Sequence, residues 1–565
     1  MTRRALEWLT TLLVSLLVLA SFFVLMEFAA YLGFKLDPSL VLGAPIVIVV
    51  AIFLGLLIGT QGFPKRMSRA FETHGLFVVI ILAIIIRLAY LNQSSIFPDE
   101  YVVLRALESK PLQNLSAFLA NYQQILGLFA IHPPLSFLLL SIGYILYPNI
   151  VGARLVSVIF STMTVALVYY LVREFGEPDL ALLTSVIYAL VSHTALFLSL
   201  ALTDGIANFF GLASFWIFVR AINRGSRKLG CLSGVLLALA LWSKALVPLF
   251  WIVLAVIYIA AGNRKPVLQS VPILGLMCGL GIGLYLPWGL VNSVAFLRSI
   301  EVLYRMTQPS ISTTNIVVAS NSTRSEPSLI ALAANLFPML KQTGLSTVSY
   351  SEILVQLPLW ITPAVFLLCL IGLAKSFRSS MRFGIFNFLW IAIPFALMVP
   401  YFRDVRYLIV IAPCYSLMAA ATVRAIRCTS AKATLASVLL ASLFIFLAVS
   451  IPISNQMYGG VQDASLELAH LGLANEKVLT NVPALTYYLP GLQLFVISSS
   501  DKPNDVLGIL RSNGIRAVVI IHNSRGAWPE IDTGTLQMIR GLFRGYISGG
   551  PSDFSWYEIY YNPSY

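Results

Sequence analysis

The chain has 565 residues, and its composition is that of a protein that crosses a membrane many times. Hydrophobic residues make up 58% of it, charged residues only 11%, and the mean hydropathy is +0.85, which excludes an ordinary soluble globular protein. The net charge of +13 does not predict nucleic-acid binding, because the basic residues lie in short segments between apolar runs. The five cysteines form no CxxC pattern, so neither a disulfide framework nor a zinc site is expected.

Apolar runs long enough to cross the hydrocarbon layer, roughly 20 residues each, predict about thirteen membrane-spanning helices. The first run is too long for a signal peptide and lacks a convincing cleavage site, so it is expected to be retained. The fold class is therefore an α-helical polytopic membrane protein. The expected spans are 6–32, 39–60, 75–91, 153–172, 180–200, 205–221, 229–243, 246–262, 268–291, 356–375, 384–400, 405–425 and 433–453.

Short basic loops indicate which ends of these spans face the cytoplasm. The segment from Pro133 to Tyr147 is apolar but short, and counting it as a full crossing would place four basic loops outside. We therefore expect it to be a surface-lying or re-entrant helix. The N-terminus is then cytoplasmic, and the residues after 455 are extracytoplasmic. The basic loops used here are 65–69, 223–228, 263–265, 375–382 and 424–432.

The C-terminal region has ordinary composition and a mixed pattern of short strands and helices. Residues 455–565 are expected to form a small α/β extracytoplasmic domain, after two N-terminal helices in 1–74 and a transmembrane core in 75–454. The expected strands are 477–480, 494–497, 517–521 and 556–561, and helices are expected at 503–513 and 534–544.

Adjacent carboxylates at Asp99 and Glu100 follow a very apolar helix. We interpret the pair as functional, because acidic residues beside a membrane span usually have a functional role. The alternative is a solvated turn. Asp204 lies at another span end on the same predicted face and could complete an acidic site or cap its helix. These acids suit a general base, and Asp99 with Asp204 could also hold a divalent metal ion.

Cations on this same face break the positive-inside trend. Lys244 ends one apolar helix, and Arg403 and Arg406 flank the start of another. An anionic phosphate from the outer leaflet would explain them, through charge-assisted hydrogen bonds. The alternatives are lipid-headgroup anchoring, an internal salt bridge, or snorkelling of Lys244 to the interface. His132 precedes two prolines and could bind substrate or a metal, or be purely structural.

Seven short motifs follow one another in a fixed order along roughly residues 75–425. They are Pro98-Asp99-Glu100, His132-Pro133-Pro134-Leu135, Arg154-Leu155-Val156-Ser157, Arg173-Glu174-Phe175-Gly176, Leu200-Ala201-Leu202-Thr203-Asp204, Ser243-Lys244-Ala245 and Arg406-Tyr407-Leu408-Ile409. In the order of these motifs the chain resembles the polyprenyl-phosphate-sugar-dependent membrane glycosyltransferases of the GT-C superfamily. It looks closest to the branch with the protein O-mannosyltransferases and the lipid A aminoarabinose transferases.

The resemblance implies a sugar donor carried on dolichyl or undecaprenyl phosphate and an active site at the outer membrane face. It implies that Asp99 is the catalytic base, that Asp204 is the second-loop acid, and that Lys244 and Arg406 face the lipid phosphate. Some relatives use a divalent metal and others do not. Two expected spans precede the helix that matches the usual first span of this family, and many relatives have lysine where this chain has His132.

The residues and the resemblance together predict a glycosyltransferase that moves a sugar to an acceptor hydroxyl on a protein, lipid or glycan. Asp99, Glu100 and Asp204 are the predicted catalytic residues, and His132, Lys244, Arg403, Arg406 and Tyr407 the predicted substrate-binding ones. A transporter or flippase for a lipid-linked glycan is the main alternative, since it would also place ionisable residues in a membrane protein. A noncatalytic membrane scaffold is a second alternative.

Overall fold

The computed structural model describes most of the chain between residues 65 and 562. The described ranges are 65–91, 97–126, 132–244, 247–262, 267–291, 361–398, 405–457, 459–497, 501, 503–523, 531–552 and 555–562, together with Leu12 and Leu16. The predicted spans 6–32 and 39–60, the long loop 292–355 and Arg403 therefore lie outside the described residues, apart from Leu12 and Leu16.

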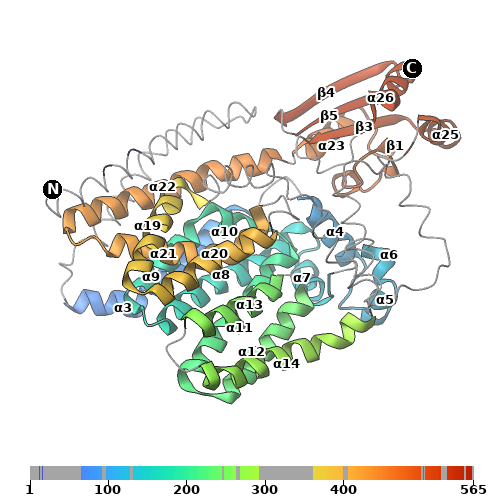
Figure 1. The fold of residues 1–565 in the computed structure, drawn as a ribbon. Coiled ribbons are helices and arrows are strands. Elements are labelled where there is room, and N and C mark those ends of the chain that lie inside the picture. The colour runs from blue at the N-terminus through green and yellow to red at the C-terminus, as the bar shows by residue number, and fades with distance from the viewer. Residues whose placement is uncertain are drawn as a thin grey trace.

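A bundle of apolar helices forms most of the described structure (Figure 1). Its largest core cluster draws buried side chains from helices throughout the bundle, so these helices pack as one body. The bundle consists of α3 (Lys65–Ala89), α8 (Ile150–Glu174), α9 (Pro178–Leu190), α10 (Ser192–Phe197), α11 (Thr203–Arg224), α12 (Arg227–Ser243), α13 (Val247–Ile257) with the π-helical η2 (Tyr258–Gly262), α14 (Val267–Val291), α19 (Pro363–Ser379), α20 (Met381–Met398), the 3-10 helix η4 (Val405–Ile411), α21 (Ala412–Arg424) and α22 (Thr429–Met457).

Several of these helices are long and apolar enough to cross a membrane, as a multi-pass integral membrane protein requires. Among the described residues, five meet this measure and five more apolar helices are shorter. The five long ones are Ile150–Glu174, Thr203–Arg224, Val267–Leu290, Arg406–Arg424 and Thr429–Ser450.

Two predicted spans are less regular than their hydropathy suggested. The run 180–200 is divided into α9 and α10, because Val191 between them has an extended backbone with φ −64° and ψ 124°. The run 405–425 begins as the 3-10 helix η4 and becomes α-helical only at Ala412. Pro413, at the start of α21, has no N–H to continue a hydrogen-bond ladder from the preceding turn.

Four short helices separate α3 from α8: α4 (Pro98–Glu108), α5 (Leu115–Ala120), α6 (Tyr122–Leu126) and α7 (Leu135–Leu146). The 12 residues of α7 give a helix of about 18 Å, well short of the roughly 30 Å of a hydrocarbon core. Glycines let α7 fold back tightly onto α8, since a Cβ at Gly143 would lie 2.0 Å from the carbonyl oxygen of Gly152. The apolar segment 133–147 thus forms a short helix.

Beyond α22 the chain forms a five-stranded mixed sheet in the order β2-β1-β3-β5-β4. β1 pairs in parallel with β2 and β3, and β5 pairs antiparallel with β3 and β4. Buried side chains form one core on each face of the sheet. The elements are α23 (Gly460–His470), β1 (Lys477–Thr480), α24 (Leu485–Tyr488), β2 (Gln493–Val496), α25 (Pro503–Asn513), β3 (Ala517–Asn523), α26 (Thr533–Leu542), β4 (Gly545–Ser552) and β5 (Ser555–Tyr561).

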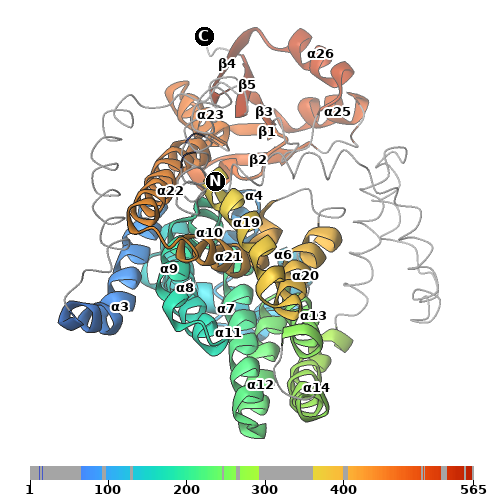
Figure 2. The same cartoon turned by 60° about the vertical axis from the view of Figure 1, so that its left-hand side comes forward.

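We call the part from α23 to β5 the tail. Four of its strands and the helices α25 and α26 coincide with predicted elements, whereas β4, with the sequence Gly-Tyr-Ile-Ser-Gly-Gly-Pro-Ser, was not predicted. Both views show the sheet at one end of the bundle, with α4 on the side of the bundle that faces it (Figures 1 and 2).

Candidate active site

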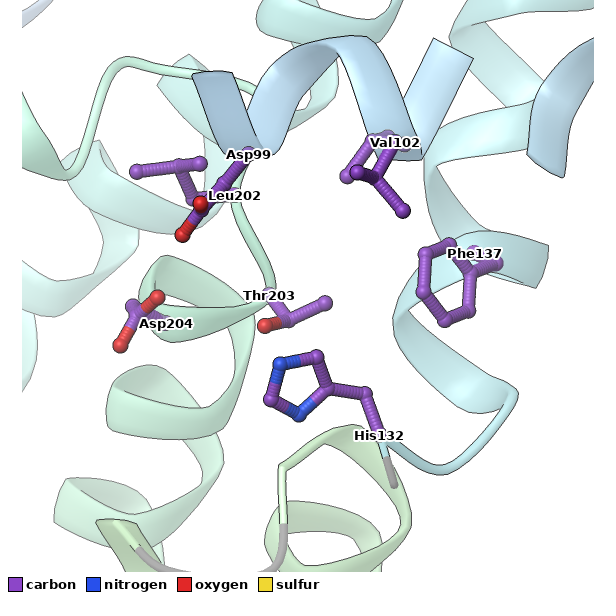
Figure 3. A pocket seen from close by; sticks show the side chains of 8 residues that line it. Asp99, Val102, His132, Phe137, Leu202, Thr203 and Asp204 are labelled. Atoms are coloured by element: carbon purple, nitrogen blue, oxygen red, sulfur yellow. The ribbon is translucent and has the colours of Figure 1, made fainter. Parts of the chain in front are cut away.

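A small pocket brings together acids from two distant parts of the chain. Asp99, in the first turn of α4, and Asp204, in the first turn of α11, both line it, and so does His132 from the segment before α7. The two carboxylates point into the same space, and the imidazole of His132 points toward Thr203 (Figure 3). The apolar side of the pocket is formed by Val102, Val103, Phe137 and Leu202.

Asp99 is held by Arg406, which lies 307 residues further along the chain. Nη1 of Arg406 donates a 2.6 Å hydrogen bond to Oδ2 of Asp99, and the arginine side chain is 6% exposed while that of the aspartate is 27% exposed. The guanidinium also lies 4.9 Å from the centre of the Phe97 ring. Asp99 is therefore the more accessible partner of a charged pair whose cation is almost completely buried.

Asp204 makes a second, deeper ion pair. Nζ of Lys244, which follows the last residue of α12, donates a 2.7 Å hydrogen bond to Oδ1 of Asp204, and both side chains are at most 6% exposed. Asp204 is not the helix cap that was considered as an alternative, because Leu202 occupies the N-cap position of α11 without a side-chain cap. In the first turn its negative charge is favoured by the helix dipole.

Tyr407 connects the two ion pairs. Its ring centre lies 4.8 Å from the Arg406 guanidinium carbon and 4.9 Å from Lys244 Nζ. Its hydroxyl accepts a 3.0 Å hydrogen bond from Nη2 of Arg406. The two cations are thus fixed on one aromatic side chain, a cation–π arrangement that gains strength in a desolvated site.

Glu100 occupies a different place from its neighbour Asp99. It forms a two-pronged pair with Arg154 of α8, with N–O distances of 2.8 and 2.7 Å, and both side chains are 0% exposed. Its carboxylate also accepts hydrogen bonds from the backbone N–H of Ala201 at 2.8 Å and of Phe97 at 3.1 Å. Glu100 does not line the pocket. This cluster of Glu100, Arg154 and the Ala201 backbone, which we call the buried knot, joins α4 and α8 to the segment that precedes Asp204.

His132 reaches the pocket from a segment whose backbone is held by a hydrogen bond. Its backbone carbonyl accepts a hydrogen bond from the Tyr122 hydroxyl. Burial, followed by the repulsion of Lys244, lowers the pKa of His132 from its ordinary 6.5 to about 3. The imidazole is therefore neutral at physiological pH and can donate or accept a hydrogen bond there.

The structure thus brings Asp99, Asp204, His132, Lys244, Arg406 and Tyr407 to one site. Sequence reasoning assigned no role to Arg154, which holds Glu100, or to the Phe97 ring, which lies against Arg406. The signal for Arg154 was a lone charge at the start of an apolar run, which needs buried polar partners nearby.

A divalent metal at Asp99 and Asp204, as predicted, has to be weighed against their ion pairs. Asp99 and Asp204 each already have a cation at hydrogen-bonding distance, and in the described part of the chain no group of three or more His, Cys, Asp or Glu side chains could hold a metal ion. A divalent ion there would have to compete with two positive side chains for its ligands.

Comparisons with known proteins agree with this architecture. Residues 131–288 match the sequence model of the family described as dolichyl-phosphate-mannose-protein mannosyltransferase, a range that contains His132, Asp204 and Lys244. No curated protein sequence matches the chain.

Two solved structures share the fold over most of the chain. The archaeal oligosaccharyltransferase AglB from Archaeoglobus fulgidus, in complex with an inhibitory peptide and a dolichol-phosphate, has a TM-score of 0.52 at 12% identity over 87% of this chain and 75% of its own. ArnT from Cupriavidus metallidurans in the apo state has a TM-score of 0.53 at 11% identity over 86% of this chain and 98% of its own.

The chain therefore shares its fold with AglB and ArnT. The family match within the bundle adds a sequence relationship, and together the two findings confirm the resemblance that the ordered motifs indicated.

Proposed function

We propose that this protein is a glycosyltransferase that moves a sugar from a polyprenyl- or dolichyl-phosphate carrier to an acceptor hydroxyl at the outer membrane face. The observation that carries the proposal is the convergence of two ion pairs, Asp99 with Arg406 and Asp204 with Lys244, on one pocket. A carboxylate can accept a proton and buried cations can stabilise a phosphate, which are the charges that such a transfer needs. The carriers named for AglB and the matched family support the donor class.

Asp99 is the proposed general base. As the acceptor oxygen attacks the anomeric carbon, its proton passes to the Asp99 carboxylate, and the bond between that carbon and the carrier phosphate oxygen breaks. The electron pair leaves with the lipid phosphate. A single displacement of this kind inverts the anomeric centre. The 27% exposure of Asp99, compared with 6% for Asp204, makes Asp99 the acid that an acceptor can reach.

Arg406 and Lys244 are the proposed sites for the departing phosphate. Both lie against Tyr407 with their charges buried, and electrostatic stabilisation by preorganised cations in a desolvated site is often the largest catalytic contribution. When the phosphate shares Arg406 with Asp99, the carboxylate loses part of its counter-charge and accepts a proton more readily. Asp204 would then keep Lys244 in place.

The remaining predicted site residues take different roles in this proposal. Glu100 was predicted to be catalytic, but its complete burial with Arg154 suits a structural role that shapes the pocket. His132, neutral at physiological pH, is the proposed hydrogen-bonding group for the substrate. The reaction as proposed proceeds without a metal ion, because the two cations already neutralise the acids. Arg403 stays a prediction for substrate binding.

The orientation follows from the same proposal. Asp99, Asp204, Lys244 and Arg406 would face the exterior, with the N-terminus in the cytoplasm and residues 455–565 as an extracytoplasmic α/β domain. The chain would divide into 1–74, 75–454 and this C-terminal domain, with about thirteen spans in all. The acceptor would be a protein, a lipid or a glycan.

The experiment that tests the function uses the full-length protein in proteoliposomes with a radiolabelled polyprenyl-phosphate sugar. Wild type should transfer label to an acceptor fraction from its own membranes, and mass spectrometry of glycoproteins and glycolipids in a strain lacking the protein should show the missing product. Movement of the intact labelled lipid between leaflets without transfer would favour a flippase instead and contradict the proposal.

A further inference from the structure

The tail touches the transmembrane part of the molecule through a small aromatic seam. Tyr487 and Tyr488, at the end of α24, pack against the apolar cluster built by α4–α8. Tyr101, two residues beyond Asp99 on α4, packs in turn against the core of the tail, as Tyr488 does. We call Tyr101, Tyr487 and Tyr488 the aromatic seam. Tyr101 and Tyr488 thus contact the cores on both sides.

Helix α24 is anchored to the sheet of the tail. The Asn481 side chain, between β1 and α24, bonds the backbone of Ile521 on β3 twice, with its amide donating at 2.8 Å and its oxygen accepting at 2.9 Å. Leu485, the first residue of α24, is completely buried in the tail core. Asn481 and Leu485 thus join α24, and with it Tyr487 and Tyr488, to the central strands of the sheet.

On the other side, the seam lies against the buried knot. The Tyr487 hydroxyl interacts with the backbone of Ile150, the first residue of α8. Both Tyr487 and Tyr488 lie near the Arg154 guanidinium of the knot. Through Glu100 the knot joins the start of α4 to the segment before Asp204, so the seam is connected by contacts to both acid-bearing elements.

We propose that the tail is a positioning element for the active site, and that Tyr101 and Tyr488 are positioning residues that hold α4 so that Asp99 stays on Arg406. The proposal rests on the proposed function, since it concerns the reach of Asp99 to its acceptor. Asp99 and Tyr101 belong to the same first turns of α4, so α4 cannot tilt at Tyr101 without moving the Asp99 carboxylate. Displacements of about 1 Å at a catalytic group can lower a rate by 10²-fold.

The test compares full-length Tyr488→Ala with the matched control Tyr546→Ala. Tyr546 lies on β4 of the same sheet and is 53% exposed, so its loss removes a tyrosine from the tail without touching the seam. We expect Tyr488→Ala to lower kcat by at least about tenfold, with the KM for the lipid-linked donor unchanged, because Lys244 and Tyr407 lie outside α4. Tyr488→Phe keeps the packing ring and should restore kcat. Equal kcat values for Tyr488→Ala and Tyr546→Ala would overturn the proposal.

A second readout does not depend on sugar transfer. Hydrogen exchange of the amides in α4 (Pro98–Glu108) should accelerate in Tyr488→Ala, while those of α12 stay as in wild type. Unchanged exchange in α4 overturns the seam as a positioning contact, even where kcat falls. If wild type transfers no sugar but α4 exchange accelerates in the variant, the mechanical coupling is supported and only the proposed function fails.

Discussion

The Arg406 guanidinium donates a 2.6 Å hydrogen bond to the Asp99 carboxylate although 307 residues separate the two in the chain. The contact joins α4 to the start of η4, and Lys244, the partner of Asp204, lies over the same Tyr407 ring as Arg406. Each proposed catalytic acid thus has its own cation. This arrangement allows separate predictions for the general base, the phosphate site and the buried knot.

Asp99→Asn should abolish turnover while the protein still folds and binds its lipid-linked donor. The amide cannot accept the acceptor's proton, and loss of a positioned general base typically lowers a rate about 10²–10⁴-fold. Initial rates of labelled-sugar transfer measure the effect, with donor binding followed separately. Glu108→Gln is the matched control, since Glu108 ends the same helix and is exposed. Undiminished transfer by Asp99→Asn would exclude Asp99 as the base.

Lys244→Met should weaken stabilisation of the departing phosphate and lower kcat/KM for the donor by about 10²-fold. The substitution also leaves the Asp204 side chain, 6% exposed, as a buried charge without its partner, which destabilises the fold. The double variant Asp204→Asn/Lys244→Met removes both charges and should recover stability without recovering activity. Lys228→Met is the control, because Lys228 is exposed in the first turn of the same helix. Recovery of activity in the double variant would mean that Lys244 serves only to neutralise Asp204.

The sequence alone placed several of the residues that lie together on one face but did not predict how they are paired. Asp99, Asp204, Lys244 and Arg406 could be placed on one face because positive-inside loops set the direction of each span. Which acid bonds which cation depends on side-chain reach and packing between helices that are far apart in sequence, and no local pattern records it. The same holds for Glu100, whose sequence neighbourhood is shared with Asp99 but whose side chain points into the buried knot.

Arg87 and Arg154 also show that the sequence does not predict the partners of a buried charge. Both are arginines within apolar helices and both are 0% exposed. Arg154 pairs with Glu100, whereas Arg87 bonds the Ser161 hydroxyl and the carbonyl oxygens of Ala83 and Ala189. Arg87 does not snorkel to the membrane interface as a lone arginine in a span often does, because the neighbouring helices bury it. Hydropathy likewise located the apolar runs but missed the breaks at Val191 and before Ala412, where individual backbone angles decide.

Glu100→Gln should destabilise the fold strongly, which would separate Glu100 from its neighbour Asp99. Removing one partner of a buried ion pair leaves an uncompensated charge and typically reduces the free energy of unfolding by about 3–5 kcal/mol, here on Arg154 with 0% exposure. Thermal unfolding in detergent measures it. Glu100→Met/Arg154→Met removes both charges and should be more stable than Glu100→Gln. A Glu100→Gln variant as stable as wild type but inactive would instead point to a direct catalytic role for Glu100.

His132 should make the folded protein sensitive to acid. Its pKa is lowered from 6.5 to about 3 in the folded state, chiefly by burial, so between these values the unfolded chain binds more protons than the folded one. The free energy of unfolding therefore rises with pH across this window: the contribution of neutral His132 is fully present above about pH 6.5 and is lost as the pH falls toward 3. His132→Gln should lose less thermal stability than wild type when the pH is lowered from 7 to 4. His470→Gln is the control, because the His470 side chain is 76% exposed in the tail. Parallel acid-stability curves for wild type and His132→Gln would show that the imidazole is protonated, or water-accessible, in the folded protein.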